Sequence, residues 1–255
     1  MDESCTNNGE RLPKSTGTHR NPAHLTEEYS ANPEIRHRIL DVSDISIAPC
    51  TESAYIRPCS MLYKQDGREK RWDFIKTHDS VSIIIYNSSK NALVFVKQFR
   101  PGVYVHNTDW DVGKTTIDVA QHPAVAGVTY ELCAGIVDKN LPLDAIAQEE
   151  VLEETGFSVP TTQLERVTSM RSGVGIAGAL QTVYFLEVTD DQREPGRGGG
   201  SAKEGELIEV VEIPLEQART MMFNEHLARP AGFMFSLMWF FTFKYPEIIK
   251  RLNGS

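Results

Sequence analysis

The feature of the sequence that most restricts the fold is a pair of almost uninterrupted apolar runs near the middle of the chain. They are SVSIIIYN at residues 80–87 and ALVFVKQF at residues 92–99. Short runs of this kind, joined by the polar turn at 87–91, predict two neighbouring buried strands. The fold must therefore be built around a sheet whose central strands are buried.

Other strand patterns lie on either side of this pair. A polar–apolar alternation around Gln65-Asp66-Gly67 predicts a hairpin, and VTYELCAG, TSMRSG, LQTVYFLEVT and LIEVVEIP predict further strands. Helical stretches are predicted at about 214–223 and 231–251. Strands that come first, with helices interleaved and at the end, favour a mixed α/β sandwich over a doubly wound sheet.

The charge balance limits the partners of the chain. A net charge of −9 and a pI near 5.3 argue against binding to nucleic acid or to an anionic membrane. An anionic substrate would have to be held by a local basic cluster or by metal ions.

Cysteine usage and hydropathy indicate the compartment. The four cysteines form no C-x-x-C pair, which favours a reducing environment. The acidic start, MDESCTNNGE, does not resemble a secretory signal, and the most apolar run, 231–243, is too short to span a bilayer. We therefore expect a cytoplasmic protein without a membrane partner.

The stretch AQEEVLEETGF, residues 147–157, places four glutamates at the end of a predicted helix that Gly156 terminates. At 100° per residue, Glu150 and Glu154 share a face with the aliphatic residues, whereas Glu149 lies near the polar side. The aliphatic residues of that face are Leu143, Ile146, Ala147 and Val151.

Two interpretations of this acidic helix compete. A solvated acidic face is common, and like-charge pairs on a helix cost only about 0.2–0.5 kcal/mol each. Carboxylates on an apolar face lose hydration, however, and no Lys or Arg lies between Lys139 and Arg166 to compensate them. A hard divalent cation such as Mg²⁺ would supply that charge, so the pattern favours a metal site.

The segment 135–157, GIVDKNLPLDAIAQEEVLEETGF, resembles the Nudix box, G-x5-E-x7-R-E-U-x-E-E-x-G-U, in which U is bulky and apolar. Leu141 stands in place of the first glutamate and Glu149 in place of the arginine, two positions that support the fold of the box in this family. The matching residues are Gly135, Glu150, Val151, Glu153, Glu154, Gly156 and Phe157.

The resemblance extends beyond the box, over about residues 45–250, to the uridine diphosphate glucose pyrophosphatase branch of the Nudix superfamily, a close relative of the ADP-ribose pyrophosphatases. RWDFIKTHDSV, LVFVKQFRPGVY, ELCAGIVD, SGVGIAGALQTVYFLEVTD and EGELIEVVEIPL carry it. It implies an α+β Nudix fold, a mixed sheet between helices with N-terminal antiparallel strands. We expect a flexible tail at 1–44, a hairpin and dimerisation segment at 45–80, and the Nudix domain at 81–255.

The resemblance also implies the metal ligands. These are Glu150 and Glu154, with Glu153 assisting in metal binding and catalysis, and the backbone carbonyl of Ala134. The expected cofactor is Mg²⁺, with Mn²⁺ as a substitute.

The catalytic base is expected on the loop EGELI, which follows the flexible sequence GRGGGSAK. Glu206 is the preferred base and Glu204 the alternative.

Substrate contacts are predicted for five residues of the chain. Arg100 matches a substrate-binding arginine of the relatives. A guanidinium suits a diphosphate because its fork can donate two parallel hydrogen bonds. Trp72 and Tyr104 could stack on a base or sugar, although core or dimer packing explains them equally well. Glu131 could touch substrate or metal, and Gly173 belongs to a loop, SGVG, that resembles a substrate loop.

The expected reaction is hydrolysis of a nucleoside diphosphate sugar, with UDP-glucose as the first choice and ADP-ribose as the second. The rival interpretation is a Nudix-fold module that binds nucleotide sugars without cleaving them. The resemblance further implies a homodimer in which residues 45–80 help to build the partner's site.

Overall fold

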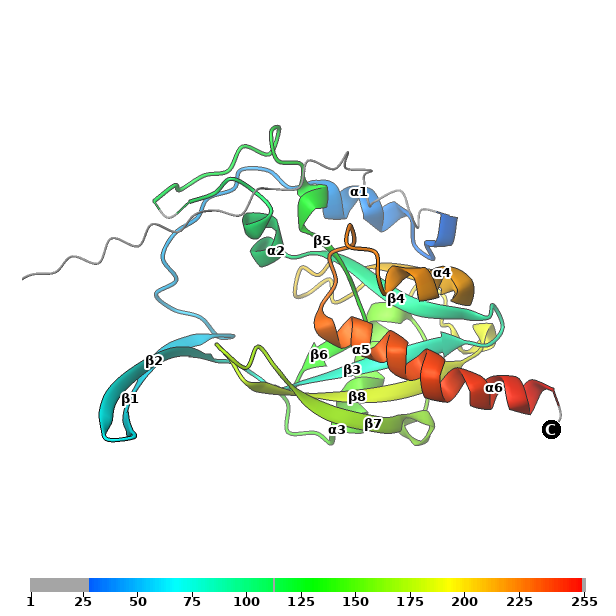
Figure 1. Cartoon of the computed structure of the whole chain (residues 1–255). Helices are drawn as coiled ribbons and strands as arrows, with labels where there is room; N and C mark the ends of the chain where they lie inside the picture. Colours follow the sequence, from blue (N-terminus) through cyan, green and yellow to red (C-terminus); the bar gives the residue numbers. More distant parts are fainter. Residues whose placement is uncertain (1–27, 112, 254–255) are drawn as a thin grey trace, which may run out of the picture.

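The computed structural model describes residues 28–111 and 113–253. Its core is a seven-stranded mixed sheet (Figure 1) in which β3 is parallel to β8 and antiparallel to β4 and β6. β4 pairs in turn with β5 and β9, and β7 forms the edge beyond β8. The strands are β3 (Ser80–Asn87), β4 (Ala92–Phe99), β5 (Val128–Glu131), β6 (Cys133–Ile136), β7 (Glu165–Ser172), β8 (Ala179–Val188) and β9 (Glu209–Pro214).

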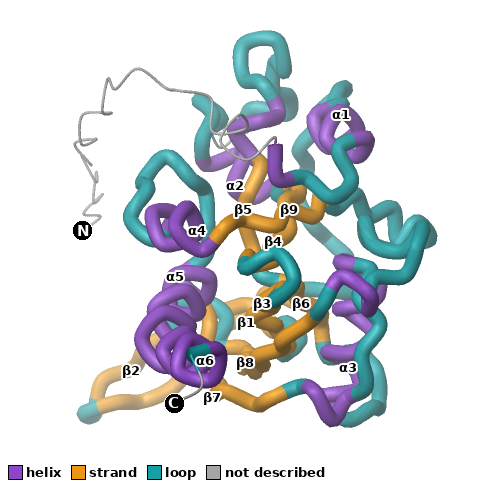
Figure 2. Tube along the Cα trace, turned by 90° about the vertical axis from the view of Figure 1, so that its right-hand side faces the viewer, coloured by secondary structure: helices purple, strands orange, loops and turns teal. Residues whose placement is uncertain are grey.

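Helices cover both faces of this sheet, with α4 to α6 on one side and α3 on the other (Figure 2). The α-helices are α1 (Glu34–Leu40), α2 (Pro101–His106), α3 (Leu143–Glu150), α4 (Leu215–Met221), α5 (Ala231–Trp239) and α6 (Tyr245–Leu252). Two π-helical turns, η3 (Val151–Thr155) and η6 (Phe240–Lys244), continue α3 and α5. Short 3₁₀ turns are η2 (Ala124–Gly127), η4 (Thr161–Gln163) and η5 (Asp190–Gln192).

Side-chain alternation along β3 explains the two layers. Ile84 and Tyr86 belong to the apolar cluster under α4 to α6, whereas Val81, Ile83 and Ile85 belong to the cluster under α3. A strand places successive side chains on opposite faces, so an apolar run such as 80–87 needs cover on both. The predicted mixed sheet between helices is confirmed.

A two-stranded hairpin, β1 (Arg57–Gln65) and β2 (Arg68–Lys76), projects away from this core (Figure 1). Asp66 and Gly67 form its turn with φ of 53° and 70°, the left-handed values that two-residue hairpin loops require. The predicted N-terminal antiparallel strands are thus present.

Two local expectations need correction. The run VTYELCAG forms two strands, because β5 pairs with β4 whereas β6 pairs with β3. The tail predicted at 1–44 includes residues 28–40, which pack against β9, since Asn32 bonds to Ile208 and Val210 and Arg36 pairs with Glu209 at 2.6 Å. Residues 1–27 lie outside the described part of the chain.

No helix between residues 28 and 253, residue 112 aside, is both long and apolar enough to cross a membrane.

Candidate active site

A cavity of about 490 Å³ collects most of the residues that the sequence singled out. It lies where the end of β4 and strand β6 meet α3, η3 and the loop before β9. Its charged lining residues are Asp138, Glu150, Glu153, Glu154, Glu204 and Glu206, with Arg100 and Lys139. Its other lining residues are Tyr55, Ser80, Gln98, Ala134, Gly135, Ile136 and Gln181.

The strand and the helix of the box touch directly inside this cavity. A Cβ added at Gly135 would lie 2.0 Å from the carboxyl carbon of Glu150, so only glycine permits this approach. The Ala134 N–H donates to a carboxylate oxygen of Glu154 at 3.0 Å. Glu150 and Glu154 therefore face β6, on the apolar side of the helix, as the helical periodicity predicted.

The glutamates sit at the negative end of the helix, and neighbouring N–H groups offset that polarity. The helix ends at Gly156 with a φ of 80°. The N–H groups of Gly199 and Gly200 donate to the carbonyls of Glu154 and Glu153 at 2.9 and 3.1 Å. Carbonyls that a helix end leaves without partners are thus satisfied by the glycine-rich segment before β9.

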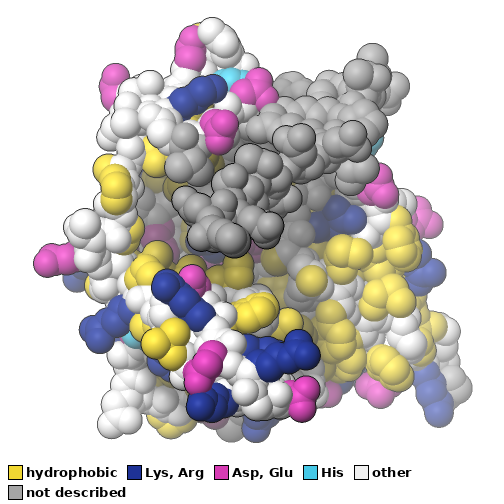
Figure 3. Space-filling model, turned by 60° about the vertical axis from the view of Figure 1, so that its left-hand side comes forward, with side chains coloured by type: hydrophobic (Ala, Val, Ile, Leu, Met, Phe, Trp, Pro, Cys, Tyr) yellow, Lys and Arg dark blue, Asp and Glu magenta, His cyan; other side chains and the backbone are white. Residues whose placement is uncertain are grey.

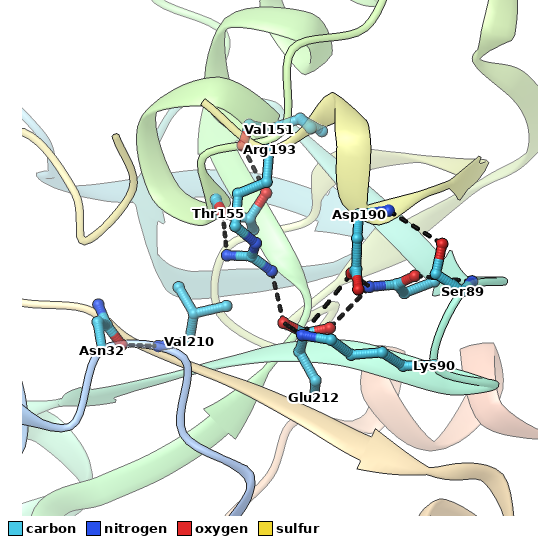
Figure 4. A network of polar contacts seen from close by, with 10 residues as sticks. Asn32, Ser89, Lys90, Val151, Thr155, Asp190, Arg193, Val210 and Glu212 are labelled. Carbon is cyan, nitrogen blue, oxygen red and sulfur yellow. Dashed lines mark hydrogen bonds and ion pairs between the residues drawn. The ribbon is translucent and has the colours of Figure 1, made fainter. Parts of the chain in front are cut away.

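A partly buried ionic network links the same helix end to β9 (Figure 4). The guanidinium of Arg193 donates to the Thr155 carbonyl at 2.9 Å and to the Glu212 carboxylate at 2.7 Å. It also lies 4.2 Å from the centre of the Phe157 ring. Further donors to the Glu212 carboxylate are Lys90 and Asn87.

The carboxylates of the cavity have raised pKa values. Burial is the main cause for Glu150, whose pKa rises to about 7; the charges of Glu153 and Glu206 add to this effect, and Lys139 opposes it. Burial also raises the pKa of Glu154 well above its usual range, and that of Glu153 less strongly. Raised carboxylate pKa values in a cleft are typical of functional sites.

Glu150, Glu153 and Glu154 and the carbonyl of Ala134 could hold a divalent cation. The fit is one of donor chemistry, because hard cations prefer oxygen ligands and would relieve the repulsion among these carboxylates. In residues 28–111 and 113–253, no three His, Cys, Asp or Glu side chains converge into a ready-made metal site. A cation shared by these carboxylates would require their side chains to turn toward one another.

Arg100 is held in place by Glu131. Two nearly parallel bonds of 2.8 and 2.7 Å join the guanidinium to the two carboxylate oxygens. Burial raises the pKa of Glu131, but the hydrogen bonds and charge of Arg100 and the hydroxyl of Thr129 outweigh it, so the pKa lies below the usual value. Arg100 lines the cavity, whereas Glu131 is not among the lining residues and reaches the site through Arg100.

The loop before β9 brings Glu204 and Glu206 to the cavity, opposite the helix. A carboxylate oxygen of Glu206 accepts a bond from the Ser201 N–H at 2.9 Å. The loop is closed at its base, where the Ile208 N–H donates to the Gly199 carbonyl at 3.0 Å. The tip therefore extends from a base that is bonded to the helix.

Besides Glu131, three residues predicted to contact substrate are not among the lining residues of this cavity. Trp72 is 54% exposed on β2, and its indole N–H donates to the Gly175 carbonyl. Tyr104 is 1% exposed, because it packs against Phe99 and donates to a backbone carbonyl. Gly173, with a φ of 54°, forms a turn between β7 and β8. For Tyr104 the packing alternative is the correct one.

Other lining residues were missed. Gln98 lies two residues before Arg100, on the same face of an extended strand, so strand periodicity could have found it. Asp138 and Lys139 belong to the loop of the box, at positions that the box pattern does not specify. Tyr55 and Gln181 come from distant segments, and no sequence pattern marks them.

Comparison with known proteins gives close relatives. The chain is 43% identical over 217 residues to the uridine diphosphate glucose pyrophosphatase NUDT14 of Bos taurus and 42% identical to that of Mus musculus; each alignment covers 81% of this chain and 97% of the relative. It is 33% identical over 147 residues to a GDP-mannose pyrophosphatase of Enterobacter sp. (strain 638), covering 56% of this chain and 64% of the relative. No protein-family model matches the chain.

A mixed sheet between helices, with a strand–loop–helix of glutamates against a cavity, defines a hydrolase of the Nudix class. Within that class the relatives are specific. The chain belongs to the Nudix hydrolase family, in the branch of the uridine diphosphate glucose pyrophosphatases.

Proposed function

We propose that this protein hydrolyses the diphosphate link of a nucleoside diphosphate sugar, with UDP-glucose as the preferred substrate and UMP and glucose 1-phosphate as products. The observation that carries the proposal is the cavity in which the glutamates of the box, the two glutamates of the loop and Arg100 all meet. The names of the two mammalian relatives support the choice of UDP-glucose.

The residues of the cavity divide the work. Arg100, oriented by Glu131, donates parallel hydrogen bonds to diphosphate oxygens. Glu206, with Glu204 as the alternative, accepts a proton from the attacking water, whose oxygen bonds to phosphorus as the bridging P–O bond breaks. Mg²⁺, or Mn²⁺ in its place, held by Glu150, Glu153, Glu154 and the Ala134 carbonyl, would neutralise the diphosphate and lower the pKa of water.

The loop favours an enzyme over a binding module. A protein that only binds nucleotide sugars needs no base, yet Glu204 and Glu206 both reach the cavity that the box glutamates line. Each loop glutamate adds negative charge, which opposes the binding of an anion. Their presence is therefore better explained by catalysis than by affinity.

The decisive test is product formation by the purified full-length protein. UDP-glucose, GDP-mannose and ADP-ribose should be incubated with Mg²⁺, with Mn²⁺ and with excess EDTA, and the nucleoside monophosphates separated by chromatography. We expect UMP from UDP-glucose at the highest kcat/KM and no turnover in EDTA. Turnover that survives EDTA, or no turnover of any of the three substrates, would contradict the proposal.

The base is identified with two matched variants. Glu206→Gln should lower kcat by about 10²–10⁴, the usual contribution of a general base, whereas Glu204→Gln should change it less. Glu216→Gln, on the exposed side of α4, is the control. The reverse order of the two effects would make Glu204 the base.

We also propose a homodimer, with residues 45–80 as the dimerisation segment of the Nudix domain at 81–255. Met61 and Trp72 are direct cross-strand partners on the hairpin, and both are about half exposed. The hairpin carries six Lys or Arg and three Asp or Glu, although the whole chain has a net charge of −9. Figure 3 shows hydrophobic and basic side chains mixed with fewer acidic ones on this side of the molecule, and the basic surplus of the hairpin suits an acidic partner surface.

A further inference from the structure

One of the two departures from the box pattern, Glu149, takes part in an ion pair. Glu149, which replaces the arginine of the box, accepts a hydrogen bond from the Lys139 ammonium at 2.7 Å. Leu141, which replaces the first glutamate, is 43% exposed. In the Lys139–Glu149 pair the helix supplies the negative side chain, and the loop of the box supplies the positive one.

Lys139 is a second cationic side chain in the lining of the cavity, beside Arg100. Lys139 and Arg100 are the basic residues of its lining, against six carboxylates. The guanidinium of Arg100 is bound by Glu131 through both carboxylate oxygens, and the Glu131 side chain is only 14% exposed. A diphosphate bears two negative charges, so it meets a lining that is strongly acidic apart from these two residues.

The Lys139–Glu149 pair is suited to sharing its cation. Both side chains are about half exposed, and exposed ion pairs contribute little to stability. An ammonium group has three donors, so Lys139 can keep its bond to Glu149 and donate to a phosphate oxygen as well. Glu149 confines a long flexible side chain to the rim of the cavity.

We infer that Lys139 binds the diphosphate of the nucleotide sugar and that Glu149 is the residue that positions it. The inference rests on the proposed function, and it gives a role to Glu149, one of the two positions at which this chain departs from the box. The alternative is that the pair supports the loop of the box and does not contact the substrate.

Two measurements on Lys139→Met separate these roles. If Lys139 binds substrate, KM for UDP-glucose rises about tenfold and kcat stays within about threefold. Binding of Mg²⁺ alone, measured by calorimetry without nucleotide, is expected to tighten or stay the same, because the removed charge repels a cation. Loss of loop support would instead weaken Mg²⁺ binding and substrate binding together.

The role of Glu149 is tested by a double-mutant cycle. Glu149→Gln should raise KM by less than Lys139→Met does, and it should have no further effect in the Lys139→Met background. Lys139→Arg keeps the charge, so its KM should stay close to that of the wild-type protein. Lys250→Met, at an exposed position of α6, should leave KM unchanged.

The inference is overturned if Lys139→Met leaves KM unchanged while the wild-type protein turns over, or if it weakens Mg²⁺ binding. Additive effects of Glu149→Gln and Lys139→Met on KM would also overturn the positioning role. Absence of turnover in the wild-type protein would instead refute the proposed function, so the two failures are distinguishable.

Discussion

Glu154 is a buried residue whose charged form is disfavoured by its surroundings in the fold. It is 3% exposed, and burial raises its pKa well above the usual range. The Ala134 N–H is its backbone donor. A buried carboxylate of this kind is costly unless an opposite charge compensates it, which is the expected signature of a residue kept for binding rather than stability.

Glu154→Gln should therefore stabilise the metal-free protein while it abolishes activity. The amide oxygen can still accept from Ala134, but the buried charge is gone. We expect a higher Tm in EDTA at pH 8, by about 2–4 °C for each kcal/mol gained, and a kcat reduced by orders of magnitude. Glu225→Gln, at an exposed position, is the control. A variant with full turnover would contradict the assigned role.

Glu150 predicts how stability depends on pH. Its folded-state pKa of about 7 lies above the usual value of 4.5, so between these values the unfolded state binds fewer protons. The contribution of Glu150 to the free energy of unfolding is therefore most favourable below about pH 4.5 and is lost as the pH rises through about 7. In EDTA, Tm should therefore fall between pH 5 and pH 8, measured by calorimetry.

The control for this prediction is Glu150→Gln, which should flatten the decline. Saturating Mg²⁺ should raise Tm more at pH 8 than at pH 5.5, because protons compete with the cation for the same oxygens. A Tm in EDTA that does not change over this range would contradict the raised pKa of the cluster.

At the scale of elements, the end of the box helix depends on contacts from outside the box. η3 is closed by Gly199 and Gly200, and Arg193 links the Thr155 carbonyl to Glu212 on β9. β9 follows the loop that carries the proposed base. The Arg193 guanidinium thus connects the helix that carries the candidate metal ligands with β9, the strand that follows the loop of the proposed base.

Arg193→Met should cost about 2–3 kcal/mol of unfolding free energy, below the full value for a broken buried pair because Lys90 still contacts Glu212. Adding Glu212→Gln should recover part of the loss, since no buried charge is then left with fewer partners. Urea denaturation measures both. Arg251→Met, which breaks a more exposed pair with Glu187, should cost less than about 1 kcal/mol. Equal losses in the two single variants would contradict this view.

The sequence predicted elements well where one local period decides them. The runs at 80–87 and 92–99 form β3 and β4 as expected, and helical periodicity placed Glu150 and Glu154 correctly. It could not show that 128–135 divides between two partner strands, because pairing partners leave no trace in a local pattern. The same limit explains Tyr55 and Gln181, which tertiary contacts alone bring to the cavity.

Aromatic type did not reveal where the side chains of Trp72 and Tyr104 lie in the fold. Trp72 and Tyr104 are both large and apolar, yet one is half exposed on the hairpin and the other is buried beside Phe99. Residue type fixes what a side chain can do and leaves open where it lies. Spacing within the box was informative because one helix carries all three glutamates.

For the whole molecule, the projecting hairpin is the feature that a single chain leaves unexplained. Most of its residues are exposed, and isolated two-stranded hairpins are marginally stable in water. Met61 and Trp72 form an exposed apolar pair on one of its faces. A second copy of the chain would cover this surface.

We expect the protein to have about twice the 28.6 kDa mass of the chain by light scattering. Met61→Asp should shift the mass toward that of one chain and lower activity, because a charge at a buried interface is unfavourable. Phe243→Asp, at an exposed apolar position elsewhere, should leave the mass unchanged. A wild-type monomer that stays fully active on dilution would contradict the dimer.

The surplus of acidic over basic groups around the cavity has a kinetic consequence. A nucleotide that arrives without a counter-ion would meet this negative charge, so we expect the cation to bind first or together with the nucleotide. We therefore expect that the nucleotide does not bind before the cation. A large excess of free nucleotide should inhibit the reaction, because it sequesters the cation.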